Sequence, residues 1–127
     1  MILVDTSVWV DHLRRRDLVL ANLLDIGAVL THPFVVGEVA LGSLPRRDFV
    51  LRSFDQLPKV EVASQDEVRR FIEDHALFGR GIGHVDVHLI ASTLLTPGTE
   101  LWTRDKRLRG IAVQFELAFA PPASRRN

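Results

Sequence analysis

The amino-acid sequence predicts an α/β fold in which a parallel sheet of four to five strands lies between two layers of helices. Short, fully apolar runs of strand length alternate along the chain with longer segments that carry apolar residues at helical spacing. Strands that are apolar on both faces are typical of parallel sheets. Parallel neighbours need crossover connections, and right-handed crossovers place helices on both faces of the sheet.

The first half of the chain predicts two strands and four helices. The short polar side chains of residues 5–7 favour a helix directly after the first apolar run. Asp17 is placed to cap a second helix, and Pro33 and Pro45 are placed to open two more, because proline favours the first turn. The strands cover residues 1–4 and 28–31, and the helices cover about residues 8–13, 18–26, 33–41 and 45–54.

The second half predicts three further strands and three helices. Ser64 and Glu67 have the spacing of a capping box, which begins the most clearly marked helix of the chain. Glycines at positions 79, 81 and 83 predict a flexible turn, and Pro97 ends the helix that follows it. The strands cover residues 59–62, 100–103 and 113–115, and the helices cover about residues 65–76, 85–95 and 104–110.

Length and composition agree with one average domain. The chain has 127 residues, 46% of them hydrophobic and 25% charged, and this balance excludes disordered and collagen-like classes. We expect a single domain over residues 1–127, with 121–127 as a flexible tail. There is no apolar run of the ~18 residues that a membrane span needs, no signal-peptide pattern and no cysteine. We therefore expect a cytoplasmic protein without a membrane association.

The charge balance bears on nucleic-acid binding. The 16 basic and 16 acidic residues give a formal net charge of zero, which excludes binding to nucleic acid through net positive charge alone. Nearly all the basic residues are arginine, whose guanidinium is suited to bidentate phosphate contacts. Either phosphate recognition or the base composition of the genome accounts for this bias.

Two acidic residues follow predicted strands directly. Asp5 comes after the first strand, and Asp105 comes just after the strand at 100–103. Open α/β sheets place their ligand sites at the carboxyl ends of strands, beside a change in strand order. An Asp after a strand also serves as a helix cap, so it is the occurrence at two strand ends that indicates a site.

A third acid, Glu38, is the one charged residue of an otherwise apolar helix. An unpaired buried carboxylate costs several kcal/mol. We therefore expect Glu38 to be paired, to bind a cation, or to turn outward at a gap in the core, with Gly37 providing room.

The fourth acid, Asp86, lies in the first turn of a predicted helix, where the helix dipole favours an anion. His84 and His88 stand on either side of it at a spacing of four residues, but no further ligand is suitably spaced for zinc. We expect His88 either to orient an acid or to pack in the core.

Together these four acids predict a divalent-metal site. Carboxylates gathered at one sheet edge repel one another unless a cation neutralises them, and oxygen ligands select hard ions such as Mg²⁺ or Mn²⁺. Such an ion supports hydrolysis of phosphodiester bonds. Thr6, Ser7 and Thr103 are placed to position a water molecule. A role for Ser7 as a nucleophile is weaker, because no Gly-x-Ser-x-Gly elbow surrounds it.

Four sequence motifs, which occur in order over nearly the whole chain, together match a known pattern. They are residues 1–9 (MILVDTSVW), Gly37-Glu38, residues 81–92 (GIGHVDVHLIAS) and residues 103–108 (TRDKRL). The chain resembles the PIN-domain ribonucleases, specifically the VapC toxins of bacterial and archaeal toxin–antitoxin pairs. The resemblance implies a PIN-like three-layer α/β/α fold.

The resemblance also implies a function and a set of partners. It implies an endoribonuclease dependent on Mg²⁺ or Mn²⁺ that acts on structured RNA, forms a homodimer or a dimer of dimers, and is inhibited by a small VapB-type antitoxin. Its catalytic and metal-binding residues would be Asp5, Glu38, Asp86 and Asp105, with Thr6, Ser7 and Thr103 as auxiliaries. The chain departs from some members, which carry a further acid after the position of Asp105, and a single metal ion is therefore expected.

Two other classes of function stay open. A non-catalytic RNA- or protein-binding module would keep the fold and would be expected to lose an acid, yet none is lost. A phosphotransferase that forms an aspartyl-phosphate also places Asp after its first strand, but its haloacid-dehalogenase form needs Asp-x-Asp, and position 7 is Ser. Large aromatic residues in excess of what a small core needs further predict self-association through an exposed patch.

Overall fold

A parallel sheet with the strand order β2-β1-β3 forms the centre of the molecule. The computed structural model describes residues 1–122. The central strand is β1 (Ile2–Val4), which is flanked by β2 (Val29–Leu30) and β3 (Glu100–Trp102). Leu3 is paired with Leu30 on one side and with Leu101 on the other. Residues 2–4 of the first apolar run are therefore buried and paired on both sides, as predicted, while Met1 is exposed.

The two edges of this sheet are each extended by a single parallel bridge. Thr31 pairs with Lys59 at one edge, and Leu101 pairs with Ala118 at the other. The strand predicted at 59–62 is thus reduced to one bridge, because after Val60 its backbone turns to other partners, such as the Thr96 hydroxyl that accepts from the amide of Glu61. The predicted α/β class with a parallel sheet is confirmed.

The prediction of a strand at 113–115 is wrong. Helix α7 (Lys106–Gln114) runs through this segment. Leu108, Ile111 and Ala112 are buried at helical spacing on its inner face, while Val113 is exposed. This burial favours continuation of the helix over the local strand propensity of the segment.

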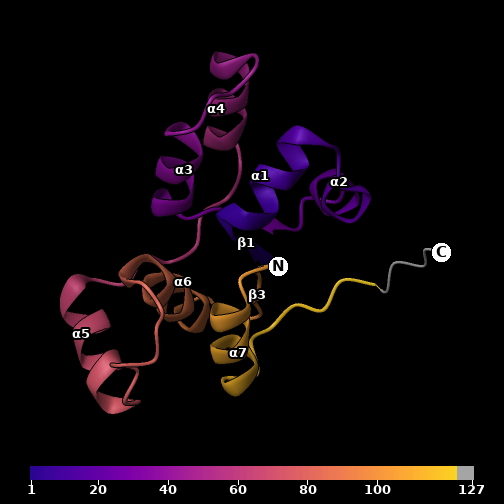
Figure 1. Ribbon diagram of the computed structural model, residues 1–127. Helices are drawn as coiled ribbons and strands as arrows, with labels where there is room; N and C mark the ends of the chain where they lie inside the picture. The colour runs from indigo at the N-terminus through magenta and orange to yellow at the C-terminus, as the bar shows by residue number, and fades with distance from the viewer. Residues whose placement is uncertain (123–127) are drawn as a thin grey trace.

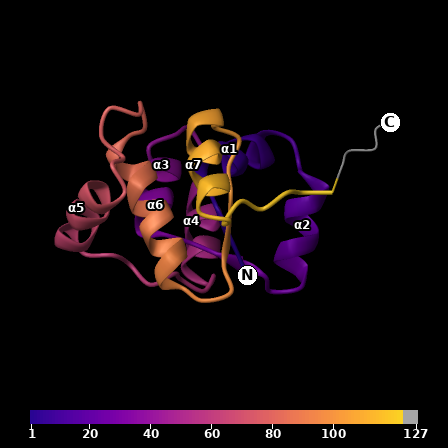
Figure 2. The same cartoon turned by 90° about the horizontal axis from the view of Figure 1, so that it is seen from below.

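The helices form layers above and below the strands. In Figure 1 the first four helices lie on one side of the strands and the last three on the other. Figure 2, which looks from below, has α5, α6 and α7 in front of α1, α3 and α4. The three-layer arrangement is the predicted one. The helices that precede α7 are α1 (Thr6–Arg14), α2 (Leu18–Asp25), α3 (Pro33–Ala40), α4 (Arg47–Asp55), α5 (Gln65–Asp74) and α6 (His84–Leu95).

The predicted helix starts are largely confirmed. The carboxylate of Asp17 accepts a hydrogen bond from the amide of Leu20, and Ser64 and Glu67 form both hydrogen bonds of a capping box. Helix α4 begins at residue 47 rather than at Pro45, because Arg46 has a left-handed backbone with φ 53°, which no α-helix can contain.

The termini and the surface of the fold add little regular structure. Residues 120–122 form no helix or strand, and the rest of the predicted tail, residues 123–127, lies outside the described residues. Within residues 1–122, every helix is too short or too polar to cross a membrane.

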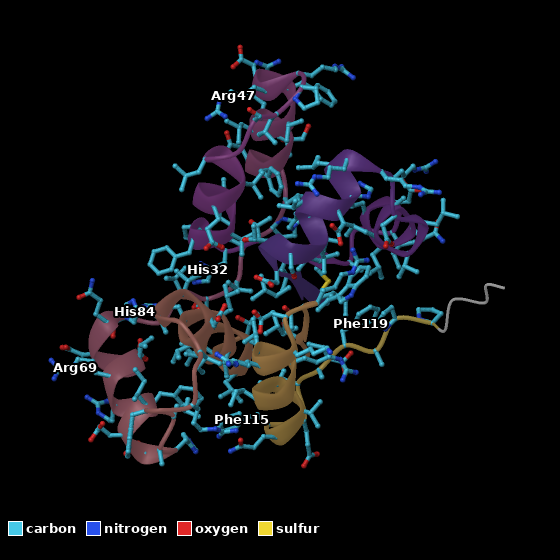
Figure 3. The ribbon with its side chains drawn as sticks, viewed as in Figure 1. His32, Arg47, Arg69, His84, Phe115 and Phe119 are labelled. Atoms are coloured by element: carbon cyan, nitrogen blue, oxygen red, sulfur yellow. The ribbon has the colours of Figure 1, made fainter. Side chains whose placement is uncertain are left out.

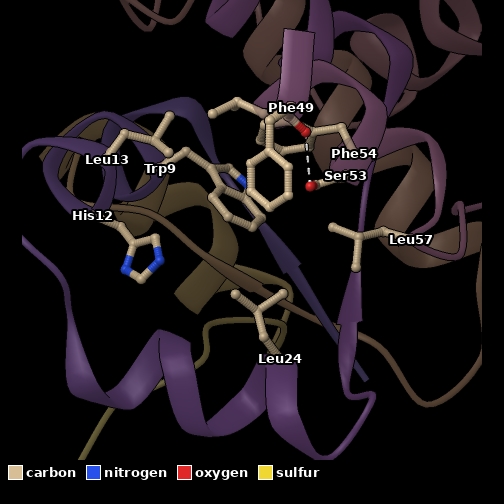
Figure 4. A pocket seen from close by; sticks show the side chains of 9 residues that line it. Trp9, His12, Leu13, Leu24, Phe49, Ser53, Phe54 and Leu57 are labelled. Atoms are coloured by element: carbon tan, nitrogen blue, oxygen red, sulfur yellow. Dashed lines mark hydrogen bonds between the residues drawn. The ribbon is translucent and has the colours of Figure 1, made fainter. Parts of the chain in front are cut away.

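An apolar cavity of about 250 Å³ lies between α1, α2 and α4 (Figure 4). Trp9 and Phe54 meet edge to face at its wall, with ring centroids 4.6 Å apart, and both are buried. Phe34, Phe49 and Phe78 are exposed and come from separate segments of the chain. The exposed aromatic residues are thus spread over the surface, and self-association stays a prediction.

We predict that Leu20→Ala lowers the free energy of unfolding by about 2–5 kcal/mol, because Leu20 is fully buried and the substitution leaves a cavity. The matched control is Leu18→Ala, which truncates the same side chain on the same helix at a position that is 67% exposed. Chemical denaturation followed by circular dichroism measures both. Equal losses in the two variants would contradict the assignment of Leu20 to the core.

Candidate active site

Asp5 is the first acid of the site and directly follows β1. Its residue is only 6% exposed. Its Oδ2 accepts hydrogen bonds from the Ser7 hydroxyl at 2.8 Å and from the Thr103 hydroxyl at 2.7 Å. Ser7 belongs to α1 and Thr103 follows β3, so the carboxylate joins the ends of two neighbouring strands. These contacts compensate for the loss of hydration on burial.

Asp105 lies between the end of β3 and the start of α7. Its Oδ1 accepts a hydrogen bond from the amide of Leu108 at 2.9 Å and so caps α7. Its own amide donates to the Thr103 hydroxyl at 3.1 Å. Thr103 therefore contacts both Asp5 and Asp105, as expected if the two strand ends form one site.

Glu38 faces outward from α3 and meets α1. Its residue is exposed, and its Oε1 accepts a hydrogen bond from the Thr6 hydroxyl at 2.6 Å. Of the options left open by the sequence, Glu38 therefore takes the outward one together with a polar partner. The room expected from Gly37 is not needed, since a Cβ there would meet nothing within 4 Å.

Asp86 stands in the first turn of α6, behind the glycine turn. Its Oδ2 accepts from the amide of Gly83 at 3.2 Å. The turn is held against α7, because the Arg107 guanidinium donates to the carbonyl oxygen of Gly81 at 3.2 Å. Gly81 has φ +77°, a left-handed conformation that favours glycine, and a Cβ there would lie 2.7 Å from Arg107 Nη1 and displace that guanidinium.

The electrostatics of Asp86 show that the four acids converge. Burial raises the pKa of Asp86, and the negative charges of Asp5, Asp105 and Glu38 raise it further, against the hydrogen bond from Gly83 that lowers it. The structure thus brings the four acids, which are up to 100 residues apart in the sequence, to one edge of the sheet.

The hydrogen bonds of these acids suit a bound cation. Each carboxylate uses one oxygen for the contacts given above, and its second oxygen has no hydrogen-bond partner within residues 1–122. Carboxylate oxygens are the donors that Mg²⁺ and Mn²⁺ prefer. In the described part of the chain, however, no three His, Asp or Glu side chains are gathered closely enough to hold a metal ion as they stand. The donor set fits the metal in its chemistry, and coordination would require the side chains to draw together.

His88 packs and does not orient an acid. Its ring is buried, and neither ring nitrogen has a hydrogen-bond partner among the described residues. It meets His84 and Phe34 edge to face, with centroids 4.6 and 4.9 Å away. Burial lowers the pKa of His88, and burial with the charge of His88 lowers the pKa of His32 to about 4. Figure 3 shows His32 and His84 where the starts of α3 and α6 approach one another.

Sequence reasoning missed one part of the site. Arg104, between Thr103 and Asp105, forms ion pairs with Asp11 and Asp17. Arg104 lies inside the motif of residues 103–108, but no local sequence signal indicates a partner 93 residues earlier in the chain.

The fold and the acidic site define a class, and the chain belongs to the PIN-domain family, whose sequence pattern matches residues 2–114. It is also similar to two proteins named Ribonuclease VapC32, from two strains of Mycobacterium tuberculosis. Each is 45% identical over 124 residues, which covers 98% of this chain and 100% of the relative. The resemblance found in the sequence is thereby confirmed.

We predict that Asp86→Asn raises the melting temperature in a chelating buffer near neutral pH. A carboxyl whose pKa is raised on folding stabilises the folded state below its unfolded pKa of about 3.9 and loses that stabilisation as pH rises through the folded pKa. At neutral pH the charged Asp86 is therefore unfavourable, and Asn removes that charge while keeping an acceptor for Gly83.

The difference between Asp86→Asn and the unsubstituted protein should shrink as the pH is lowered toward about 4. Differential scanning calorimetry at several pH values measures it. Asp25→Asn, at an exposed position of α2, is the control. A variant less stable than the parent protein at neutral pH would contradict mutual repulsion in the site.

Proposed function

We propose that this protein is a metal-dependent endoribonuclease and the toxin of a toxin–antitoxin pair. Membership of the PIN-domain family and the similarity to proteins named Ribonuclease VapC32 support the proposal. The observation that carries it is that Asp5 and Asp105, which follow β1 and β3, share contacts with Thr103, and that their charges and that of Glu38 act on Asp86. An uncompensated acidic cluster of this kind is suited to a cation and a phosphate ester together.

Asp5, Glu38, Asp86 and Asp105 are the catalytic residues of this proposal and would hold the metal through their free oxygens. The ion is Mg²⁺, for which Mn²⁺ can substitute. When bound, it supplies a Lewis acid that stabilises charge on the phosphate and favours ionisation of a water molecule.

The remaining work falls to the side chains that hold these acids in place. Thr103 and Ser7 both donate to the same oxygen of Asp5, and the other oxygen has no hydrogen-bond partner within residues 1–122. Thr6 does the same for Glu38. Thr103 also accepts from the Asp105 amide, so that a single hydroxyl fixes the spacing of two acids. These hydroxyls therefore serve to orient the carboxylates.

Cleavage of RNA as a function of added metal tests the proposal. We predict that a panel of structured RNAs is cut when Mn²⁺ or Mg²⁺ is titrated in, and that a chelator abolishes cleavage. Asp5→Asn should lower the cleavage rate by about 10³-fold or more, because it removes a charge at the metal while keeping the acceptor for Ser7 and Thr103.

The matched control for this variant is Asp25→Asn, which removes a charge from an exposed position on α2. Full metal-dependent activity in Asp5→Asn would refute the catalytic assignment. RNA binding without cleavage at any metal concentration would instead identify a non-catalytic binding module. A phosphorylated aspartate in place of RNA cleavage would identify a phosphotransferase.

The same proposal implies control by a partner, a VapB-type antitoxin, and assembly of the toxin into a homodimer or a dimer of dimers. The acidic site needs a cation, so we expect an Arg or Lys of the antitoxin to pair with two or more of the four carboxylates through charge-assisted hydrogen bonds. This side chain would compete with the metal for the same oxygens.

We predict that raising Mn²⁺ weakens inhibition by the intact antitoxin more than inhibition by a variant truncated at that Arg or Lys. Cleavage assays at several metal concentrations measure the difference. Complete inhibition that does not respond to metal would show that the antitoxin excludes RNA sterically and leaves the carboxylates free.

A further inference from the structure

Arg104 connects the site to the first two helices through its side chain. Its Nη1 donates to Asp11 Oδ2 at 2.6 Å, and its Nη2 donates to Asp17 Oδ2 at 2.7 Å. Asp11 belongs to α1, and Asp17 is the cap of α2. One guanidinium thus binds two carboxylates of different helices, which is a geometry that arginine provides and lysine does not.

The backbone of Arg104 is part of the site itself. Its amide donates to the Ser7 hydroxyl at 3.0 Å, and this hydroxyl in turn donates to Asp5 at 2.8 Å. The residues on either side, Thr103 and Asp105, contact Asp5 and cap α7. Movement of the Arg104 backbone would therefore alter the support of two acids at once.

The positive charge of Arg104 is neutralised by the two carboxylates that it binds. Burial lowers the pKa of Arg104, but the hydrogen bonds from its guanidinium to Asp11 and Asp17 outweigh it and raise that pKa. Burial by itself raises the pKa of Asp17, yet hydrogen bonds from Leu20 and Arg104 lower it overall. Two carboxylates face one guanidinium, so the group as a whole presents no positive charge to an incoming phosphate.

We propose that Arg104 is a positioning residue of the active site. Its ion pairs with Asp11 and Asp17 hold the residue in place, and its backbone thereby keeps Ser7 and Thr103 in contact with Asp5. The expected effect on RNA cleavage rests on the proposed function, whereas the expected effect on hydrogen exchange at residue 104 does not.

The chief rival role is direct contact with RNA. Arg104 and Arg14, Arg15 and Arg16 line an open cavity of about 370 Å³ together with Asp11 and Asp17. A phosphate there would have to draw Arg104 away from its two carboxylates. The two roles predict opposite effects when Asp11 is removed, because Asp11 supports a positioning residue but competes with a phosphate.

The test uses Asp11→Ala, Arg104→Gln, Arg104→Lys and their matched controls in the full chain. Asp11 is chosen over Asp17 because Asp17 also caps α2. Asp25→Ala and Arg109→Gln are the controls, since each removes the same charge at an exposed helix position whose side chain has no hydrogen bond or ion pair among the described residues. The two readouts are hydrogen exchange at the amide of residue 104 and steady-state RNA cleavage.

We expect Asp11→Ala and Arg104→Gln to lower kcat by about tenfold with KM nearly unchanged, as is common for residues that support metal ligands. The kcat of Arg104→Lys should lie between the kcat of these variants and that of the parent protein, because lysine can reach one carboxylate. The double variant should be no slower than Arg104→Gln alone, since both substitutions break the same link. The amide of residue 104 should exchange about tenfold faster in Asp11→Ala and not in Asp25→Ala.

Unchanged exchange at residue 104 in Asp11→Ala overturns the inference whatever the kinetics. A lower KM in Asp11→Ala with a higher KM in Arg104→Gln also overturns it and assigns Arg104 to RNA binding. If the parent protein cleaves no RNA with any metal, the proposed function fails, and the exchange measurement alone decides the positioning role.

Discussion

The pairing of β1 with β3 is the interaction on which the site depends. In this register Val4 lies opposite Trp102, so the next residues of each strand, Asp5 and Thr103, come together at the carboxyl edge. The amide of Asp5 donates to the carbonyl oxygen of Trp102, and the Thr103 hydroxyl donates to the Asp5 carboxylate. A slip of one residue would point these side chains to opposite faces. The buried carboxylate is tolerated because this register provides its donors.

Around this pair each of the other acids accepts a hydrogen bond, two from the backbone of their own helix starts and one from a neighbouring helix. Asp105 caps α7 and Asp86 accepts from the backbone at the start of α6, while Glu38 meets a hydroxyl on α1. Helix starts are favourable places for carboxylates, because free amides and the helix dipole stabilise negative charge there. Local stabilisation of each acid therefore offsets part of the repulsion among them.

Three arginines connect the segments that carry the acids to neighbouring helices. Arg107 donates to the turn before α6, Arg80 in that turn donates to Gln114 of α7, and Arg104 binds the helices that follow β1. The arginine bias of the sequence left phosphate recognition and genome composition as explanations. For these three arginines the structure shows a different use, in which the guanidinium joins segments that flank the acids. Arg14, Arg15 and Arg16 line an open cavity together with Arg104.

The sequence by itself determined the α/β class, the strand segments at 1–4, 28–31 and 100–103, and most helix starts, and it indicated the four candidate acids. These features depend on local chemistry, namely apolar runs, caps such as Ser64 and Asp17, and acids placed after strands. It misjudged residues 113–115, where burial of Ile111 and Ala112 outweighs strand propensity, and it expected a room-giving role for Gly37 that the exposed Glu38 does not need. Only the tertiary structure decided that Glu38 meets Thr6, that His88 packs, and that Arg104 binds Asp11 and Asp17. Such contacts join residues far apart in the chain, and their partners are selected by how helices pack on the sheet, which no local pattern records.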